Sequence, residues 1–489
     1  MKKILNLKNQ VYLSLLWSSA GTAVTFISKI IVLSVLARLL SPNEFGKVGV
    51  AILVVDFGRK FTQIGMGPAI IQRKVLLPIH ISTGHIVNII LNVLMFFLIF
   101  LISPWIATFF NTSEIINILR VLSFCFLIRS ISIIPLALIT RNINFKINAK
   151  IDSISYVFGY GFFGVVSALL NFGLWSLVIA IIMEAIFKTI LILHYNKEKV
   201  SYKFCFKALQ DLLNFGIGQS IYQFSNYFAL QGDNFVVGKF LGASQLGIYG
   251  RAYQLISMPS KLFAQAFGKV LFPVFSKIQD NTMKLQHIYV NGIKIAGTVI
   301  IPFGVLISFC APEIIQILLG DQWMEAVMPV RIFAMVIYFR ILYAISNIVL
   351  KSTGNVYIMA YLQIFYGLTV LILSYVGSIF YGVSGVAIGV SLSIFLHIII
   401  VNIALKMKLD FSFNRFLLSI SPSFILGFFN FILFYLTHIL LSGTEFHPLV
   451  SLIVYGTIML SFSSFCIYIF PEIFLGIYHT KILSNLKLK

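Results

Sequence analysis

The sequence predicts an all-α polytopic membrane protein of about fourteen transmembrane helices, with two pseudo-symmetric six-helix lobes around a central cavity and a C-terminal helix pair. Three observations predict this fold class. Apolar residues make up 59% of the 489 residues and charged residues only 10%, a balance that a water-soluble globule does not reach. Apolar stretches of about 20 residues, the length that crosses a bilayer, recur from near Val11 to near Pro471. Finally, several short patterns of the first half return in the second half.

The repeat is clearest in the turn between the first two crossings. Residues 37–46, ARLLSPNEFG, are matched by residues 238–247, GKFLGASQLG. Three later matches follow in the same order, at offsets of roughly 200 to 211 residues: Ser103-Pro104 with Ala311-Pro312, Arg120 and Arg129 with Arg331 and Arg340, and residues 172–175 with residues 381–384. Every hairpin needs turn-forming residues, which is the alternative explanation, but paired arginines are not turn chemistry. We therefore infer an internal parallel repeat, as in two-lobed transporters.

The apolar stretches and the polar turns between them place the crossings at 12–40, 45–66, 81–103, 115–139, 148–170, 175–194, 215–241, 245–270, 288–311, 326–350, 357–380, 384–405, 417–440 and 448–471. Residues 1–200, with crossings one to six, are predicted to form the N-terminal lobe. Residues 201–408, with crossings seven to twelve, form the C-terminal lobe, and residues 409–489 hold the last two crossings and a cytoplasmic tail. Between the lobes lies a basic linker that is expected to face lipid headgroups, with Lys197, Lys199, Lys203 and Lys207.

The formal charge of +21 would suggest nucleic acid as a partner of a soluble protein, but in a membrane protein the placement of charge matters more. Lysine and arginine collect at both termini and in alternate turns. The opposite turns hold Glu114, Glu313, Asp321, Glu325 and Glu445 instead. By the positive-inside rule both termini are predicted to be cytoplasmic, and no nucleic-acid partner is expected.

No pattern in the sequence indicates catalysis, a cofactor or a metal. The four cysteines, Cys125, Cys205, Cys310 and Cys466, have no metal-ligand spacing. There is no Gly-rich phosphate loop followed by Lys-Ser/Thr, and the outer turns are too short to build an aqueous active site. We expect a transporter without a cofactor rather than an enzyme.

Ionisable side chains at membrane depth are the candidate functional residues, because such groups are costly unless they face protein or water. Arg129 and Arg340 lie too deep to reach the surface and are predicted to be a symmetric pair of inward-facing cations. Lys29 is a third deep cation. Asp56 and Arg59 are spaced for an ion pair on one helix face; Arg59 is also a candidate cavity cation that binds the substrate, and Asp56 is a candidate for ion coupling.

Further charges lie in the sixth, seventh and eighth crossings. Glu184 and Lys188 are spaced four apart and are predicted to pair with each other. Asp233 is a second candidate for binding a coupling proton or sodium ion, and Arg251 is a further cavity cation; alternatively Asp233 neutralises Lys239 or Arg251. Cations outnumber anions inside the membrane, so the ligand is expected to be an anion, and guanidinium groups suit phosphate.

Five segments carry a resemblance to a known family: residues 37–46, residues 69–74 (AIIQRK), residues 141–146 (RNINFK), residues 271–279 (LFPVFSKIQ) and residues 318–323 (LLGDQW). They resemble the bacterial polysaccharide-transport family of lipid-linked oligosaccharide flippases, the Wzx-type branch of the multidrug/oligosaccharidyl-lipid/polysaccharide exporter superfamily, in its colanic-acid-exporter-like members. The likeness runs from about Lys8 to about Lys408. One departure, Gly65-Met66-Gly67-Pro68, puts only the local turn in doubt.

The resemblance implies a flippase of undecaprenyl-diphosphate-linked oligosaccharide units for O-antigen, capsule or exopolysaccharide, working by alternating access in the bacterial cytoplasmic membrane. It also implies membrane lipids, a polysaccharide polymerase and a chain-length regulator as partners. Three other functions stay open at this point: a flippase of the peptidoglycan lipid precursor, a cation-coupled drug exporter, and a non-transporting scaffold of a polysaccharide synthesis complex.

Overall fold

The computed structural model describes residues 21, 23–63, 65–142, 145–196, 198, 203–354, 356–409, 413–440 and 447–475. Residues 12–20 of the first predicted crossing, Lys197 and Lys199 of the predicted linker, and the predicted cytoplasmic tail from residue 476 lie outside the described residues. The described part of the chain consists of helices and the turns between them, without strands, which confirms the predicted all-α class. It divides into two compact units that meet at Gly247 and Ile248.

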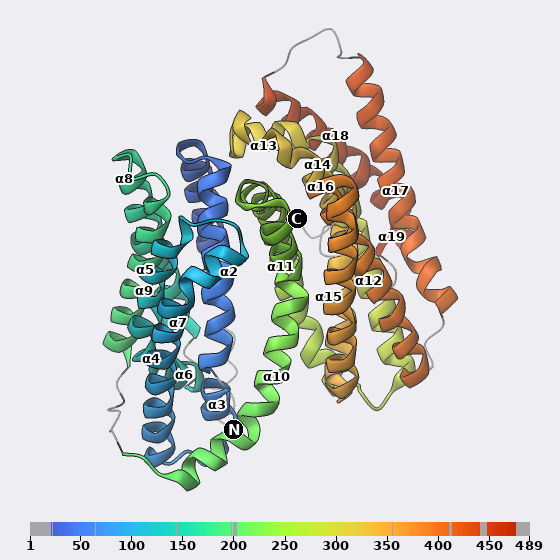
Figure 1. The fold of residues 1–489 in the computed structure, drawn as a ribbon. Coiled ribbons are helices and arrows are strands. Elements are labelled where there is room, and N and C mark those ends of the chain that lie inside the picture. The colour runs from blue at the N-terminus through green and yellow to red at the C-terminus, as the bar shows by residue number, and fades with distance from the viewer. Residues whose placement is uncertain are drawn as a thin grey trace. The chain divides into compact units, whose positions relative to one another are not determined.

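The helices of the first unit follow one another with short turns (Figure 1). They are a helix over residues 23–39, α2 (Pro42–Gln63), α3 (Met66–Gln72), α4 (Pro78–Phe109), α5 (Ile115–Ser130), α6 (Ile133–Arg141), α7 (Phe145–Ile154), the π-helical η1 (Ser155–Phe162), α8 (Phe163–Leu169), α9 (Trp175–Tyr195), α10 (Phe206–Val236) and the π-helical η2 (Val237–Leu241). Helix α5 lies between α4 and α9, and α10 packs against α2, α3 and α4.

The second unit begins within α11 (Ala243–Lys277), whose first turn belongs to the first unit. It continues with α12 (Thr282–Phe309), α13 (Ala311–Leu318), the 3-10 helix η3 (Asp321–Ala326), α14 (Val327–Met335), α15 (Ile337–Ser352), α16 (Val356–Leu409), α17 (Phe413–Leu440), α18 (Pro448–Ile469) and α19 (Pro471–Leu475). Helix α12 packs against α14, α15 and α17.

Each of the fourteen predicted crossings coincides with helical structure in its described part. By length and composition, seven described helices are able to cross a membrane, or up to nine if each of two bent pairs is one span. The long α16 covers two predicted crossings and turns back at Tyr381 and Gly382, where the backbone is not helical. A Cβ on Gly377 would stand 2.1 Å from the Gly385 carbonyl oxygen, so the two halves of α16 pack closely as a hairpin. The chain is a multi-pass membrane protein; the count of fourteen stays a prediction.

Two pairs of features in the structure agree with an internal repeat. The pair α5 and α6 is bent by 46° at residues 131–132, and the pair formed by residues 321–335 and 337–352 is bent by 45° at residue 336. Gly173 and Gly382, which match in sequence, both have a φ of 55°, a conformation that favours glycine. One match fails, because Ser103-Pro104 lies inside α4, which continues to Phe109, whereas Ala311-Pro312 opens α13.

The two repeated turns also touch each other. A Cβ on Gly46 of α2 would stand 1.6 Å from the carbonyl oxygen of Ala243, and a Cβ on Gly247 of α11 would stand 2.0 Å from the carbonyl oxygen of Pro42. Gly46 matches Gly247 in the repeat, and Pro42 matches Ala243. The contact is therefore reciprocal.

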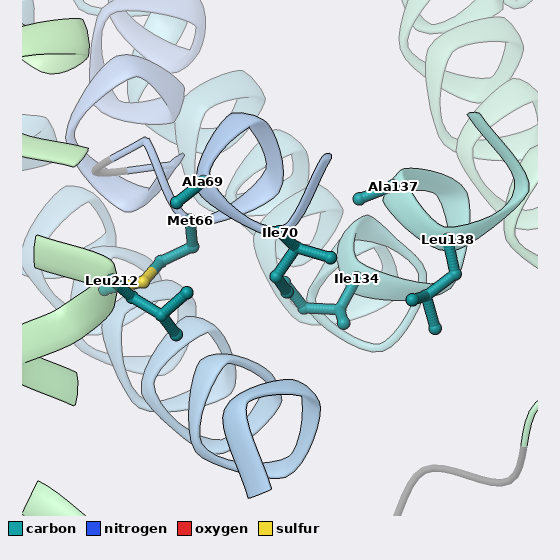
Figure 2. Close-up of a cluster of buried hydrophobic side chains, with 7 residues drawn as sticks. All are labelled: Met66, Ala69, Ile70, Ile134, Ala137, Leu138 and Leu212. Atoms are coloured by element: carbon teal, nitrogen blue, oxygen red, sulfur yellow. The ribbon is translucent and has the colours of Figure 1, made fainter. Parts of the chain in front are cut away.

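A buried apolar cluster joins α3, α6 and the start of α10 (Figure 2). Met66, Ala69 and Ile70 come from α3, and Leu212 is the contribution of α10. Gly65, the residue before α3, has a φ of 62°, so this glycine makes the turn at which the sequence departs from the family pattern. The cluster holds α3, α6 and the beginning of α10 together in the first unit.

Candidate functional site

A cavity of about 220 Å³ lies in the first unit, between α2, α4, α5, α6 and α9. Its charged and polar lining consists of Arg59, Gln63, Asn92, Cys125, Arg129, Ser132, Glu184, Lys188 and Thr189. Three of these side chains are basic and one is acidic, so the lining of the cavity carries an excess of positive charge. The predicted central cavity between the two lobes stays a prediction.

The break between α5 and α6 builds one wall of the cavity. Arg129 lies in the last turn of α5, and Ser132 and Ile133 follow directly at the break. The Asn88 amide of α4 donates to the freed carbonyl of Ser130 at 2.6 Å, and the Thr189 hydroxyl of α9 donates to the Ile128 carbonyl at 3.2 Å. Side chains of neighbouring helices thus satisfy the interrupted backbone, which keeps Arg129 at a fixed position beside the cavity.

Of the three basic residues that line this cavity, Arg129 is the one whose guanidinium group forms no ion pair with a described residue. Among the described residues, none forms a hydrogen bond or an ion pair with its guanidinium group. Arg59, in contrast, forms an ion pair with Asp56 at 3.0 Å, which is the pair that the spacing on α2 predicts. Five donors in a planar fork make the Arg129 guanidinium suitable for two oxygens of one anion.

The predicted pair of Glu184 with Lys188 is wrong. Lys188 instead contacts Asp152 of α7, with 2.6 Å between its Nζ and the Asp152 Oδ1. Helix α7 packs against α9 and brings the Asp152 carboxylate within reach of the ammonium, which local spacing along α9 does not reveal. No hydrogen bond or ion pair joins the Glu184 carboxylate to any of the described residues, although it faces the cavity.

Lys29 lies next to this cavity without lining it. Its Nζ lies 5.3 Å from the centre of the Tyr156 ring, and Tyr156 stacks on Tyr160 at 5.2 Å. Arg129, Lys188 and Lys29 all lie close enough to Glu184 to act on it electrostatically. Lys29, Arg59 and Arg129 are therefore brought to one region of the first unit.

Arg340 occupies a different environment in the second unit. Its guanidinium carbon lies 4.5 Å from the centre of the Tyr253 ring and 5.4 Å from that of Phe333, and among the described residues neither Nε nor Nη2 finds a hydrogen-bond partner. Arg129 comes just before the break in its bent pair, whereas Arg340 lies four residues after the break at residue 336. The two arginines therefore differ in position relative to the bends, and their role as a symmetric pair stays a prediction.

The remaining predicted residues are placed as follows. Asp233 is buried at the end of α10, where its Oδ1 accepts from the backbone N–H of Asn234 at 2.8 Å. The Arg251 guanidinium donates to the side-chain carbonyl of Gln254 on the same helix. Neither residue lines the charged cavity. Among the described residues no cluster of histidine, cysteine and carboxylate side chains is suited to hold a metal ion.

A second cavity, of about 260 Å³, lies in the second unit between α12, α14, α15 and α17. Its walls include Ile301, Val305, Phe424 and Phe431, and of the described residues that line it none is charged. The two units thus differ in chemistry, since one holds a charged cavity and the other an apolar one.

The sequence prediction missed part of the charged cavity. Lys188 and Glu184 were assigned to each other rather than to the site, and Gln63, Asn92 and Thr189 were not considered. A signal was present on α9, because residues 184, 188 and 192 follow one another at intervals of four and line the cavity together.

Comparisons with known proteins agree with these features. Residues 35–328 match the family described as polysaccharide biosynthesis protein. The teichuronic acid biosynthesis protein TuaB of Bacillus subtilis (strain 168) is 25% identical over 369 residues, which cover 74% of this chain and 76% of TuaB. The lipopolysaccharide biosynthesis protein WzxC of Escherichia coli (strain K12) is 21% identical over 439 residues, 87% of each chain.

Among solved structures, the lipid II flippase MurJ in an inward closed conformation matches with a TM-score of 0.77 at 18% identity, covering 92% of this chain and 98% of MurJ. At this identity the likeness shows the fold alone. The family match covers more than half of the chain, and it includes both repeated turns and the whole charged cavity. The chain therefore belongs to the polysaccharide biosynthesis protein family, as a multi-pass, all-α membrane protein with a fold like that of MurJ.

Proposed function

We propose that this protein is a flippase that moves undecaprenyl-diphosphate-linked oligosaccharide units across the bacterial cytoplasmic membrane by alternating access, for the synthesis of a surface polysaccharide. Family membership supports transport in polysaccharide biosynthesis, and the names of TuaB and WzxC agree with it. Both termini lie in the cytoplasm in this proposal. A polysaccharide polymerase and a chain-length regulator act on the flipped unit outside the membrane.

The observation that carries the proposal is the uncommitted guanidinium group of Arg129 in a cavity with excess positive charge. A diphosphate presents several oxygens to such a group, and charge-assisted bonds in a site of low dielectric are strong. The cavity is smaller than the roughly 300–1,000 Å³ of a typical small-molecule site, so it holds the diphosphate and not the whole glycan. The prenyl chain stays in lipid.

Replacing Arg129 with alanine tests the proposal. Loss of a charge-assisted hydrogen bond of about 1.5–3 kcal/mol predicts that transport falls by tenfold or more. The measurement is flipping of a lipid-linked glycan by the purified full-length protein in vesicles, alongside surface polysaccharide in cells. Arg120→Ala is the matched control, because Arg120 lies on the same helix, stacks on Phe100 and does not line the cavity. Normal transport by Arg129→Ala would refute the site.

A second candidate function is flipping of the peptidoglycan lipid precursor, which the fold of MurJ favours. Both substrates carry a prenyl diphosphate, so the charged cavity suits either. Growth of a strain that lacks its own precursor flippase, when this protein is produced, would favour the second function. Failure to rescue, together with transport of a polysaccharide unit in vesicles, would favour the first.

A further inference from the structure

Glu184 is a carboxylate in a cavity that otherwise favours anions. It lies on α9, lines the cavity with Arg129 and Lys188, and forms no hydrogen bond or ion pair with any of the described residues. The two other carboxylates of the region are both committed, since Asp56 pairs with Arg59 at 3.0 Å and Asp152 pairs with Lys188 at 2.6 Å. Glu184 alone among these three is free to change its protonation state without breaking an ion pair.

The helices around Glu184 supply the charges that act on it. Arg129 comes from α5, Lys188 from α9 itself, Asp152 from α7 and Lys29 from the helix over residues 23–39. Cys125 of α5 and Arg59 of α2 also line the cavity, and Arg59 pairs with Asp56 of its own helix. Two tyrosines, Tyr156 and Tyr160, come from η1, while Lys60 of α2 does not line the cavity. The described residues of α8 include no charged group.

The backbone next to Glu184 has an unusual form. Eight residues of η1 are π-helical, and a Cβ on Gly159 in this segment would stand 2.6 Å from the Glu184 Cα. Glycine at this position lets η1 press directly against α9 at the carboxylate. Interruptions of α-helical hydrogen bonding of this kind are frequent at functional sites.

Charge balance links the carboxylate to the ligand. Once the pairs Asp56–Arg59 and Asp152–Lys188 are set aside as neutral, Arg129 and Lys29 provide two positive charges and Glu184 one negative charge. A diphosphate that is esterified at both ends carries two negative charges. The cluster with its ligand is neutral only if Glu184 is protonated, and a neutral cluster has the lowest cost in a medium of low dielectric.

We propose that Glu184 binds a proton whenever a diphosphate enters the cavity, which makes it the site of proton coupling. The proton comes from water on the side to which the cavity is open, a hydronium ion gives it up, and it forms an O–H bond on the Glu184 carboxylate. It returns to water when the diphosphate leaves. This inference rests on the proposed function, since it needs a diphosphate in the cavity.

Reciprocity between two bound ligands gives the expected result. If the diphosphate favours the protonated carboxylate, the proton favours the diphosphate by the same free energy. The affinity for the diphosphate then rises as the pH falls, by up to tenfold for each pH unit over the range in which one proton is taken up. With glutamine at position 184 the affinity has no such dependence, and it equals or exceeds that of the wild type at neutral pH.

The test is calorimetric titration of the full-length protein in nanodiscs with geranyl-diphosphoryl-N-acetylglucosamine. This probe is esterified at both ends, so it has no proton of its own to gain or lose near neutral pH. Two buffers of different ionisation enthalpy report the number of protons taken up. We expect about one proton for the wild type and for Glu184→Asp, which keeps a carboxylate, and none for Glu184→Gln. Glu114→Gln is the matched control, because Glu114 is exposed, pairs with Lys47 and does not line the cavity.

Each outcome decides between the two proposals. Binding by the wild type without proton uptake, or equal uptake by the wild type and Glu184→Gln, overturns the role of Glu184 and leaves the flippase function standing. No binding of the probe by the wild type overturns the flippase function itself. Should Glu184→Gln not fold, the two-buffer result for the wild type and for Glu184→Asp still decides, because absence of uptake in the wild type refutes the proposal.

Discussion

Alanine in place of Gly46 is expected to force α2 away from the first turn of α11. The new Cβ would stand 1.6 Å from the Ala243 carbonyl oxygen, and real Cβ atoms essentially never come closer than 3.0 Å, so the two backbones have to separate by about 1.4 Å. Both contacting groups are backbone, and no side chain is able to rotate out of the way. Overpacking of this kind costs about 1–3 kcal/mol, and the rigid contact places Gly46→Ala at the upper end, about 3 kcal/mol.

The free energy of unfolding of the purified protein, measured by titration with SDS in mixed micelles, checks this value. Gly250→Ala is the matched control, since Gly250 lies on α11 and a Cβ there meets nothing within 4 Å. It should be neutral or stabilise the protein by up to about 1 kcal/mol, because alanine is the better helix former. We therefore expect Gly46→Ala to lower the free energy of unfolding and Gly250→Ala to leave it unchanged or raise it.

The reciprocal contact also predicts how stable the double variant is. A single separation of the helices makes room for both new methyl groups, so Gly46→Ala with Gly247→Ala should cost clearly less than the two single substitutions added together. Stability of Gly46→Ala equal to the wild type would refute the close packing of the repeated turns. Full additivity would refute their reciprocal contact.

Three other substitutions test separate parts of the structure. The hydrogen bond from His80 holds the pKa of Asp211 below its usual value of 3.8. The ionised Asp211 therefore contributes to the free energy of unfolding above pH 3.8, and this contribution is lost as the pH falls through the lower pKa of the folded state. Between neutral and acidic pH, the free energy of unfolding of Asp211→Asn should fall by less than that of the wild type. Trp323 is fully buried, and Trp323→Ala should lower the free energy of unfolding by about 3–5 kcal/mol, whereas alanine at the exposed Met324 should change it little. Gly382 has a φ of 55° and a ψ of −134°, a conformation that only glycine adopts readily, and open space around it, so Gly382→Ala should cost about 1–3 kcal/mol from backbone strain alone in the same SDS titration.

The positions of most helices were predictable because the bilayer imposes one length and one polarity on each membrane-spanning helix. Breaks within a crossing were not predictable in the same way. Ile131 and Ser132 lie inside one predicted crossing, 115–139, and the carbonyl groups at the bend accept hydrogen bonds from Asn88 and Thr189, which belong to other helices.

The candidate site was predicted in part. Depth in the membrane was sufficient to select Arg129 and Lys29, since a cation far from either surface needs a protein or aqueous environment. Depth was also sufficient to select Arg340, but not to distinguish its aromatic surroundings from a cavity. A charged residue in an apolar helix leaves the same sequence pattern whether its side chain faces water, an aromatic ring or an oppositely charged side chain.

By itself the sequence determined that this chain spans a membrane and that it is helical. It also predicted that the two halves are related and that cations exceed anions at membrane depth. These properties follow from composition and order along the chain, which need no knowledge of distance. The tertiary structure decided which charges neutralise one another: Lys188 pairs with Asp152, and Arg129 and Glu184 at the cavity have no hydrogen-bond or ion-pair partner among the described residues. Ion pairing acts over a few ångströms in space, and residues 36 positions apart reach that distance only when their helices pack side by side.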